Sequence, residues 1–167
     1  MSNPTGKQIK SRKRVKDFAE VFTAEREVKA MCDLVNDCCM DIDATFLEPS
    51  CGTGNFLVEI INRKLLQCKS NSDILRAYRS VYGIDIQYDN VRETRTRLWK
   101  IARMHTLNWH TLTEVAKILC ENIICGDALK IFAEKEEVKK CKPRQKRRLT
   151  ALNRLGTNET GKRLGRL

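Results

Sequence analysis

The chain has 167 residues, about one domain's worth, and 41% apolar against 32% charged residues allow it to bury a core. No run of 18 apolar residues occurs, and no apolar stretch follows the basic N-terminal residues, so we expect neither a membrane span nor a secretory signal. Eight scattered cysteines without CxxC pairs favour reduced thiols in a cytoplasmic protein over a disulfide scaffold.

The net charge of +11 is unevenly distributed along the chain. Residues 1–20 carry six basic and two acidic residues, residues 133–167 carry twelve and four, and residues 21–132 carry fourteen and fifteen. The middle of the chain is therefore nearly neutral, which excludes DNA binding through the overall charge of the folded part. Composition predicts a basic mobile arm at 1–17, a folded domain at 18–132 and a basic, disordered tail from 133 onward.

The predicted elements begin with a helix over residues 24–39, with Thr23 as its N-cap. The residues of its apolar face follow helical spacing: Val28, Met31, Leu34 and Val35. A first strand at 44–47 ends in a tight turn, and a helix over 56–68 follows it.

After a polar connector at 69–73, a second strand is expected at 80–86. Asp89 or Asn90 caps the next helix, and a further helix and a third strand close the pattern; these three elements fall at 91–104, 112–120 and 122–125. Strands that alternate with helices imply parallel strands joined by crossovers, so the sequence predicts a doubly wound α/β fold.

The most informative segment is EPSCGTGNFL, which begins at Glu48 and ends at Leu57. A glycine-rich loop between a strand and a helix lets backbone approach a ligand closely. The dinucleotide fingerprint needs a small residue at position 57, so Leu57 disfavours an NAD fold. Glu48 would repel a pyrophosphate and better suits a cationic ligand without phosphate.

Acidic residues also end the two later strands. Asp85 follows the second strand and Asp127 the third, at the edge where α/β sheets bind ligands. A carboxylate at position 85 can accept hydrogen bonds from both hydroxyls of a ribose. The plainer interpretation of Asp85 is a helix N-cap.

Together, EPSCGTGNFL, YGIDIQYDNV and NIICGDAL resemble the cofactor-binding motifs of class I S-adenosylmethionine-dependent methyltransferases. More narrowly, they resemble adenine-specific DNA methyltransferases of restriction–modification systems, whose VFTP segment is matched by VFTA at 21–24. The resemblance covers about residues 14–130. It implies a Rossmann-like methyltransferase fold, incomplete in this chain, with three parallel strands in the order 3-2-1 and flanking helices.

The resemblance also implies S-adenosylmethionine as the cofactor. Glu48 and the glycine loop would meet its amino and carboxylate groups, Asp85 its ribose and Asp127 its adenine amine. The residues that the resemblance assigns to the cofactor are Phe22, Thr23, Glu48, Pro49, Cys51, Gly52, Gly54, Asn55, Phe56, Asp85, Ile86, Asp127, Ala128 and Leu129.

The family's catalytic loop, Asp/Asn-Pro-Pro-Tyr/Phe, does not occur in these 167 residues, where only Pro143 follows Pro49. We therefore expect no catalytic residue here and an inactive chain on its own, with DNA and a second chain that supplies the loop as partners. No metal site is predicted, since His105 and His110 share no helical face. The alternative is a non-enzymatic, nucleic-acid-associated Rossmann module that acts with a partner chain.

Two structural expectations complete the sequence analysis. Without a fourth strand, the first strand at 44–47 is an open edge with no charge or proline within it, which favours pairing with another chain. Cys38 and Cys39 are expected to be adjacent buried thiols.

Overall fold

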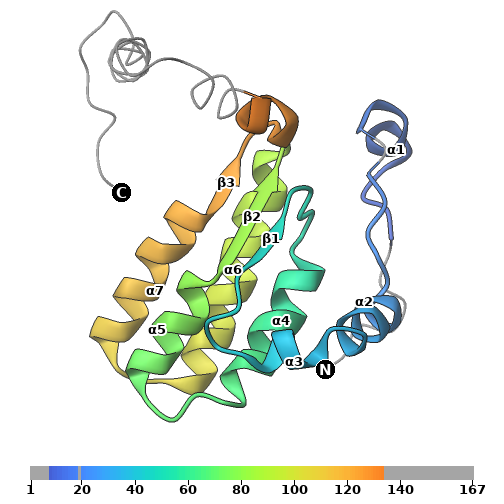
Figure 1. The fold of residues 1–167 in the computed structure, drawn as a ribbon. Helices are drawn as coiled ribbons and strands as arrows, with labels where there is room; N and C mark the ends of the chain where they lie inside the picture. The colour runs from blue at the N-terminus through green and yellow to red at the C-terminus, as the bar shows by residue number, and fades with distance from the viewer. Residues whose placement is uncertain (1–7, 19, 134–167) are drawn as a thin grey trace, which may run out of the picture. The chain divides into compact units, whose positions relative to one another are not determined.

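The structure, a computed structural model, describes residues 8–18 and 20–133 (Figure 1). The chain divides into two units, residues 1–128 and residues 129–167, and each is considered by itself. The first unit contains every helix and strand labelled in Figure 1. In the second unit the described residues, 129–133, are helical. The basic tail predicted from 133 onward otherwise lies outside the described residues.

Three short parallel strands form the sheet: β1 (Phe46–Glu48), β2 (Val81–Asp85) and β3 (Ile123–Cys125). β2 lies between the other two, so the sheet has the order β1-β2-β3 (Figure 1). Helices separate the strands along the chain, as parallel pairing requires. The predicted α/β class, the parallel pairing and the strand order are confirmed.

β1 begins two residues later than predicted and includes Glu48. The buried side chain of Lys64 explains the delay, because its ammonium group donates to three carbonyls just before the strand. These carbonyls belong to Asp41 (2.6 Å), Ile42 (3.2 Å) and Ala44 (2.7 Å). The Lys64 ammonium group therefore donates hydrogen bonds to carbonyls that precede the strand. Because β1 includes Glu48, the prediction of an edge strand without a charge is wrong.

The helix predicted over 24–39 is in fact two helices, α2 (Glu25–Asp33) and α3 (Asn36–Met40). The chain leaves helical geometry at Val35, where φ is −125° and ψ is 33°. Thr23 is not the N-cap either. That position belongs to Ala24, whose N–H donates to the Glu27 carboxylate over 3.2 Å.

The break between α2 and α3 changes which residues are buried. Of the predicted apolar face only Val28 is in the core, because Leu34 lies beyond the end of α2 and is 85% exposed. Met31 and Val35 are also exposed. Cys32 and Cys39 are buried instead, whereas Cys38 is exposed, so the prediction of adjacent buried thiols is wrong.

The N-terminal segment that we expected to be a mobile arm contains α1 (Arg12–Phe18). Arg14 of this helix forms an ion pair with Asp89 over 2.6 Å, and Lys10 pairs with Asp89 and Glu93, each over 3.1 Å. Phe22 N–H also donates to the Gln8 carbonyl over 2.7 Å. The ion pairs join Lys10 and Arg14 to α6, whereas the Phe22–Gln8 hydrogen bond lies within the N-terminal segment itself.

Between the glycine loop and β2 the chain forms α4 (Asn55–Leu65) and α5 (Asn71–Arg79). The sequence analysis missed α5 and expected only a connector at 69–73. Ser70 caps this helix by accepting from Asp73 N–H over 3.2 Å, and Ser70 Oγ donates to the Asp73 carboxylate over 2.9 Å. The Ser-x-x-Asp pattern is a capping-box signal that could have identified the helix.

α6 (Tyr88–His105) and α7 (Trp109–Asn122) connect β2 to β3. Gln87 is the N-cap residue of α6, so the predicted caps at Asp89 and Asn90 lie within its first turn. α7 begins earlier than predicted because the Asn108 side chain accepts from Thr111 N–H over 2.9 Å.

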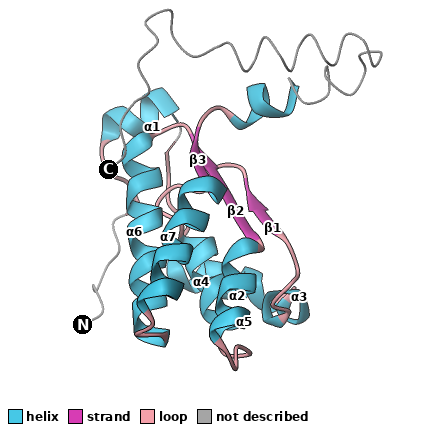
Figure 2. Cartoon of the chain, turned by 90° about the vertical axis from the view of Figure 1, so that its left-hand side faces the viewer, coloured by secondary structure: helices cyan, strands magenta, loops and turns pink. Residues whose placement is uncertain are grey.

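The core of the first unit lies where α4, α5, α6 and α7 pack against the sheet, which is small beside the helices (Figure 2). Its largest fully buried side chains include Leu57, Ile61, Tyr78, Val91, Leu98, Val115, Leu119 and Ile123. The Tyr78 hydroxyl donates to the Leu98 carbonyl over 2.8 Å, which satisfies the one polar group of that ring. No helix among the described residues has both the length and the apolar content to cross a membrane.

Candidate functional site

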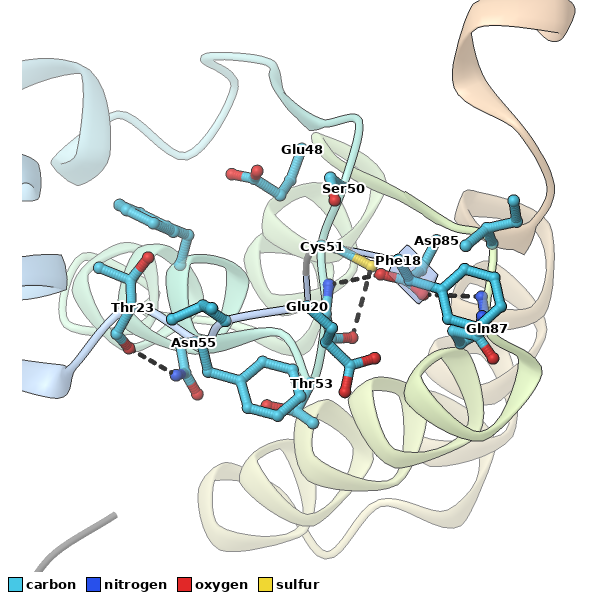
Figure 3. Close-up of a pocket in the computed structure, with 15 residues that line it drawn as sticks. Phe18, Glu20, Thr23, Glu48, Ser50, Cys51, Thr53, Asn55, Asp85 and Gln87 are labelled. Carbon is cyan, nitrogen blue, oxygen red and sulfur yellow. Dashed lines mark hydrogen bonds between the residues drawn. The ribbon is translucent and has the colours of Figure 1, made fainter. Parts of the chain in front are cut away.

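A pocket lies at the carboxyl ends of β1 and β2 (Figure 3). Three segments line it: Phe18 with residues 20–23, which precede α2; the glycine loop between β1 and α4; and the end of β2. Because parallel strands end at the same edge of a sheet, segments far apart in sequence meet here.

The glycine loop has the backbone geometry that only glycine adopts readily. Gly52 has φ 51° and Gly54 has φ 81°, both in the left-handed region. A Cβ atom on Gly54 would lie 2.6 Å from Thr94 Cγ2, and one on Gly52 would lie 3.0 Å from the Phe22 ring. Both glycines are therefore required by conformation and by space.

Two side chains of α6, Thr94 and Arg97, donate hydrogen bonds to the glycine loop. Thr94 Oγ1 donates to the Gly52 carbonyl over 3.0 Å. Arg97 donates to the Thr53 carbonyl over 2.6 Å and to Asn55 Oδ1 over 2.8 Å. Burial lowers the pKa of the Arg97 guanidinium, the direction expected for a cation removed from water.

Asn55 joins the loop to the segment before α2. While its Oδ1 accepts from Arg97, its Nδ2 donates to the Thr23 carbonyl over 2.9 Å (Figure 3). One side chain thus fixes the distance between the first two walls of the pocket.

Asp85 forms the third wall and is only 6% exposed. Its Oδ2 accepts from Gly52 N–H over 2.8 Å (Figure 3). Its Oδ1 accepts from Gln87 N–H over 2.8 Å and from Asn90 Nδ2 over 3.1 Å. The alternative interpretation of Asp85 as a helix N-cap is wrong, since Gln87 occupies that position; Asp85 instead bonds the glycine loop to the end of β2.

Glu48 differs from Asp85 in having no such bonds. Its side chain is half-buried in the pocket, and no hydrogen bond or ion pair joins it to another residue in the described part of the chain. Desolvation raises the pKa of its carboxyl group above the usual value. A carboxylate held in this way attracts a ligand that brings its own positive charge or hydrogen-bond donor.

Cys51 also lines the pocket but is unsuited to covalent chemistry. The thiol is 6% exposed, and burial, reinforced by the charges of Asp85 and Glu48, raises its pKa to about 12. The thiolate is the nucleophilic form of cysteine, so Cys51 stays protonated and unreactive at neutral pH. The seven cysteines among the described residues are free thiols.

Nine of the fourteen predicted site residues line this one pocket: Phe22, Thr23, Glu48, Cys51, Gly52, Asn55, Phe56, Asp85 and Ile86. Pro49 and Gly54 belong to the loop but do not face the pocket. Asp127 and Ala128 follow β3 and are not among the lining residues, and Leu129 belongs to the second unit.

The sequence analysis missed six lining residues: Phe18, Glu20, Val21, Ser50, Thr53 and Gln87. Five of them lie within the segments that carry the resemblance, since Glu20 and Val21 belong to the EVFTA segment at 20–24, and could have been found by taking every residue of those segments. Phe18 carries no local signal.

We compared the chain with protein-family models, with curated proteins and with solved structures, and none matched. The fold and the site therefore define a class of architecture: an α/β fold with a small parallel sheet and a pocket at the carboxyl ends of β1 and β2. Within the residues that the structure describes, no group of three or more His, Cys, Asp or Glu residues is arranged to hold a metal ion.

Proposed function

We propose that the chain is the cofactor-binding part of an S-adenosylmethionine-dependent methyltransferase of the adenine-specific DNA-modifying type. The observation that carries the proposal is the convergence of three separate motifs on one pocket, with an unpaired carboxylate, Glu48, beside a glycine loop.

The residues present fit this cofactor. Glu48 suits the amino group of the methionine end, since its side chain has no partner among the described residues, and the left-handed glycine loop lies beside it in the pocket. Asp85 and Ile86 line the same pocket and would contact the ribose and the adenine ring of the cofactor. When bound, the cofactor supplies an electrophilic methyl group on a sulfonium.

The part of this chain is to bind and orient. The loop, held by Thr94 and Arg97, sets the methionine end, and the buried Asp85 sets the nucleoside end. The acceptor side of the reaction needs a loop that these 167 residues do not contain. We therefore propose that the chain alone transfers no methyl group to DNA, and that a second chain completes the site.

Binding of S-adenosyl-L-homocysteine, measured by titration calorimetry, tests the proposal. Glu48→Gln removes one charge-assisted hydrogen bond, worth about 1.5–3 kcal/mol, so affinity should fall by about tenfold or more. Adenosine, which lacks the amino acid end, should bind both forms equally. Glu121→Gln, an exposed change at the end of α7, is the matched control and should alter neither affinity.

Three results would contradict the proposal. One is no heat of binding for S-adenosyl-L-homocysteine with the unmodified chain. A second is equal affinity of Glu48→Gln for this ligand, and a third is labelled methyl in DNA above a boiled-protein control. Salt-sensitive DNA affinity without any cofactor binding would instead favour the nucleic-acid-associated module.

A further inference from the structure

Glu20 holds a buried carboxylate oxygen that has no partner. Its side chain is 8% exposed and lines the pocket. Oε2 pairs with Arg14 over 2.7 Å and accepts from Asn90 Nδ2 over 3.0 Å, but Oε1 is buried without a hydrogen bond among the described residues. A buried acceptor without a hydrogen bond is unfavourable, so a ligand that donates a hydrogen bond to this oxygen would be stabilised.

Asp85, which also lines the pocket, has little capacity left to accept hydrogen bonds. Each carboxylate oxygen offers about two acceptor positions. The Oδ1 positions are filled by Gln87 N–H and Asn90 Nδ2, and one Oδ2 position is filled by Gly52 N–H. Asp85 can therefore accept one further hydrogen bond in this arrangement, whereas the two neighbouring hydroxyls of a ribose bring two donors.

The two carboxylates lie close together because they share a donor. Asn90 Nδ2 donates to Glu20 over 3.0 Å and to Asp85 over 3.1 Å, so the accepting oxygens are separated by less than the sum of these distances. The positive charge of Arg14, 2.7 Å from Glu20, disfavours a cation at this point. Neutral donors such as hydroxyl groups are the better match.

We propose that Glu20 and Asp85 together bind the vicinal hydroxyls of a ribose, with one hydroxyl on each carboxylate. The inference rests on the proposed function, because it takes a nucleoside as the ligand. Glu20 lines the pocket, so a hydroxyl group that enters beside it meets a carboxylate whose Oε1 has no hydrogen bond among the described residues. Asn90 is then a positioning residue that aligns the pair.

The test compares S-adenosyl-L-homocysteine with its 2′-deoxy and 3′-deoxy analogues in the unmodified chain and in Glu20→Met. Glu20→Met should weaken the parent ligand at least tenfold and leave the affinity for one of the two deoxy analogues unchanged. Arg14→Met is the control: it removes the ion pairs of Arg14 with Glu20 and with Asp89 but keeps the Glu20 carboxylate, so it should change all three affinities by the same factor.

The outcomes separate the two proposals. If the unmodified chain binds the parent ligand and Glu20→Met weakens all three ligands equally, or none, the role of Glu20 is overturned and the proposed function stands. If the unmodified chain binds none of the three ligands, both the proposed function and this inference are contradicted. Should Glu20→Met show no cooperative melt, Glu20→Gln is measured with the same ligands, and the same loss of discrimination between them is required.

Discussion

At the scale of single residues, the pocket depends on two glycines and a few long-range hydrogen bonds. Gly54 is held at φ 81° with Thr94 of α6 directly against its backbone. Thr94 also donates to the Gly52 carbonyl, so the same side chain both limits the space and fixes the turn. The loop is therefore built by contact with α6 as much as by its own sequence.

Gly54→Ala should lower the free energy of unfolding by about 1–3 kcal/mol from backbone strain, with a further loss from the clash with Thr94. Urea denaturation followed by circular dichroism measures the change. In the double variant Gly54→Ala/Thr94→Ser, the Cγ2 atom that would lie 2.6 Å from the added Cβ is absent. This variant should therefore recover the steric part of the lost stability but not the part due to backbone strain. Unchanged stability in Gly54→Ala would show that the turn is not left-handed.

At the scale of elements, α1 is joined to the rest of the first unit by ion pairs rather than by apolar packing. None of its residues is buried, yet Arg14 pairs with both Glu20 and Asp89. Such a helix should respond to pH and salt more than α4 or α6, whose apolar faces are in the core.

The pKa of Asp89 is expected to lie well below its usual value, because Arg14 and Lys10 hydrogen-bond its carboxylate. Because the pKa of Asp89 is lower in the folded state, its ionised carboxylate stabilises the protein at pH values above the ordinary pKa of 3.8. This stabilisation is lost as the pH falls below 3.8 toward the folded-state pKa. Carboxyl NMR titration should show a low pKa that rises toward 3.8 in Arg14→Gln. An ordinary pKa in the unmodified chain would mean that α1 does not dock as described.

α5 is the element whose start depends most on a single cap. Ser70→Ala removes the acceptor for Asp73 N–H and should cost about 1 kcal/mol of stability. Ser72→Ala, an exposed change in the first turn of α5, is the matched control. Its free energy of unfolding should stay within about 0.5 kcal/mol of that of the unmodified chain. Thermal melts of the three proteins provide the comparison, and equal losses in both variants would contradict the capping role.

At the scale of the whole molecule, the sheet has little of its own to stabilise it. Three strands are near the lower limit for independent stability. In the sheet formed by the described residues, β1 is an edge strand. Leu47 in this strand is 49% exposed. We therefore expect self-association through β1 at micromolar concentrations.

Leu47→Lys should shift the chain toward monomer in sedimentation velocity while leaving the thermal midpoint nearly unchanged, because a second charge in the edge strand, beside Glu48, disfavours pairing with another chain. Leu107→Lys adds the same charge at an exposed position away from the strand, so it is the control and should not favour the monomer. A monomer with a sharp cooperative melt in the unmodified chain would show that the edge is already protected.

The sequence by itself determined the alternation of strands and helices, the glycine loop and the acidic end of β2, because each is encoded by short-range pattern: apolar runs, glycines and turn residues within about ten positions. Tertiary structure alone decided which side chains hold the site together, as Asn90 and Arg97 do. Their partners lie as much as 80 residues away in sequence, as in the Lys10–Asn90 hydrogen bond, and no local propensity specifies such a pairing. The break between α2 and α3 was likewise unpredictable, since helical periodicity continues through Leu34 while burial against α4 selects Cys32 and Cys39.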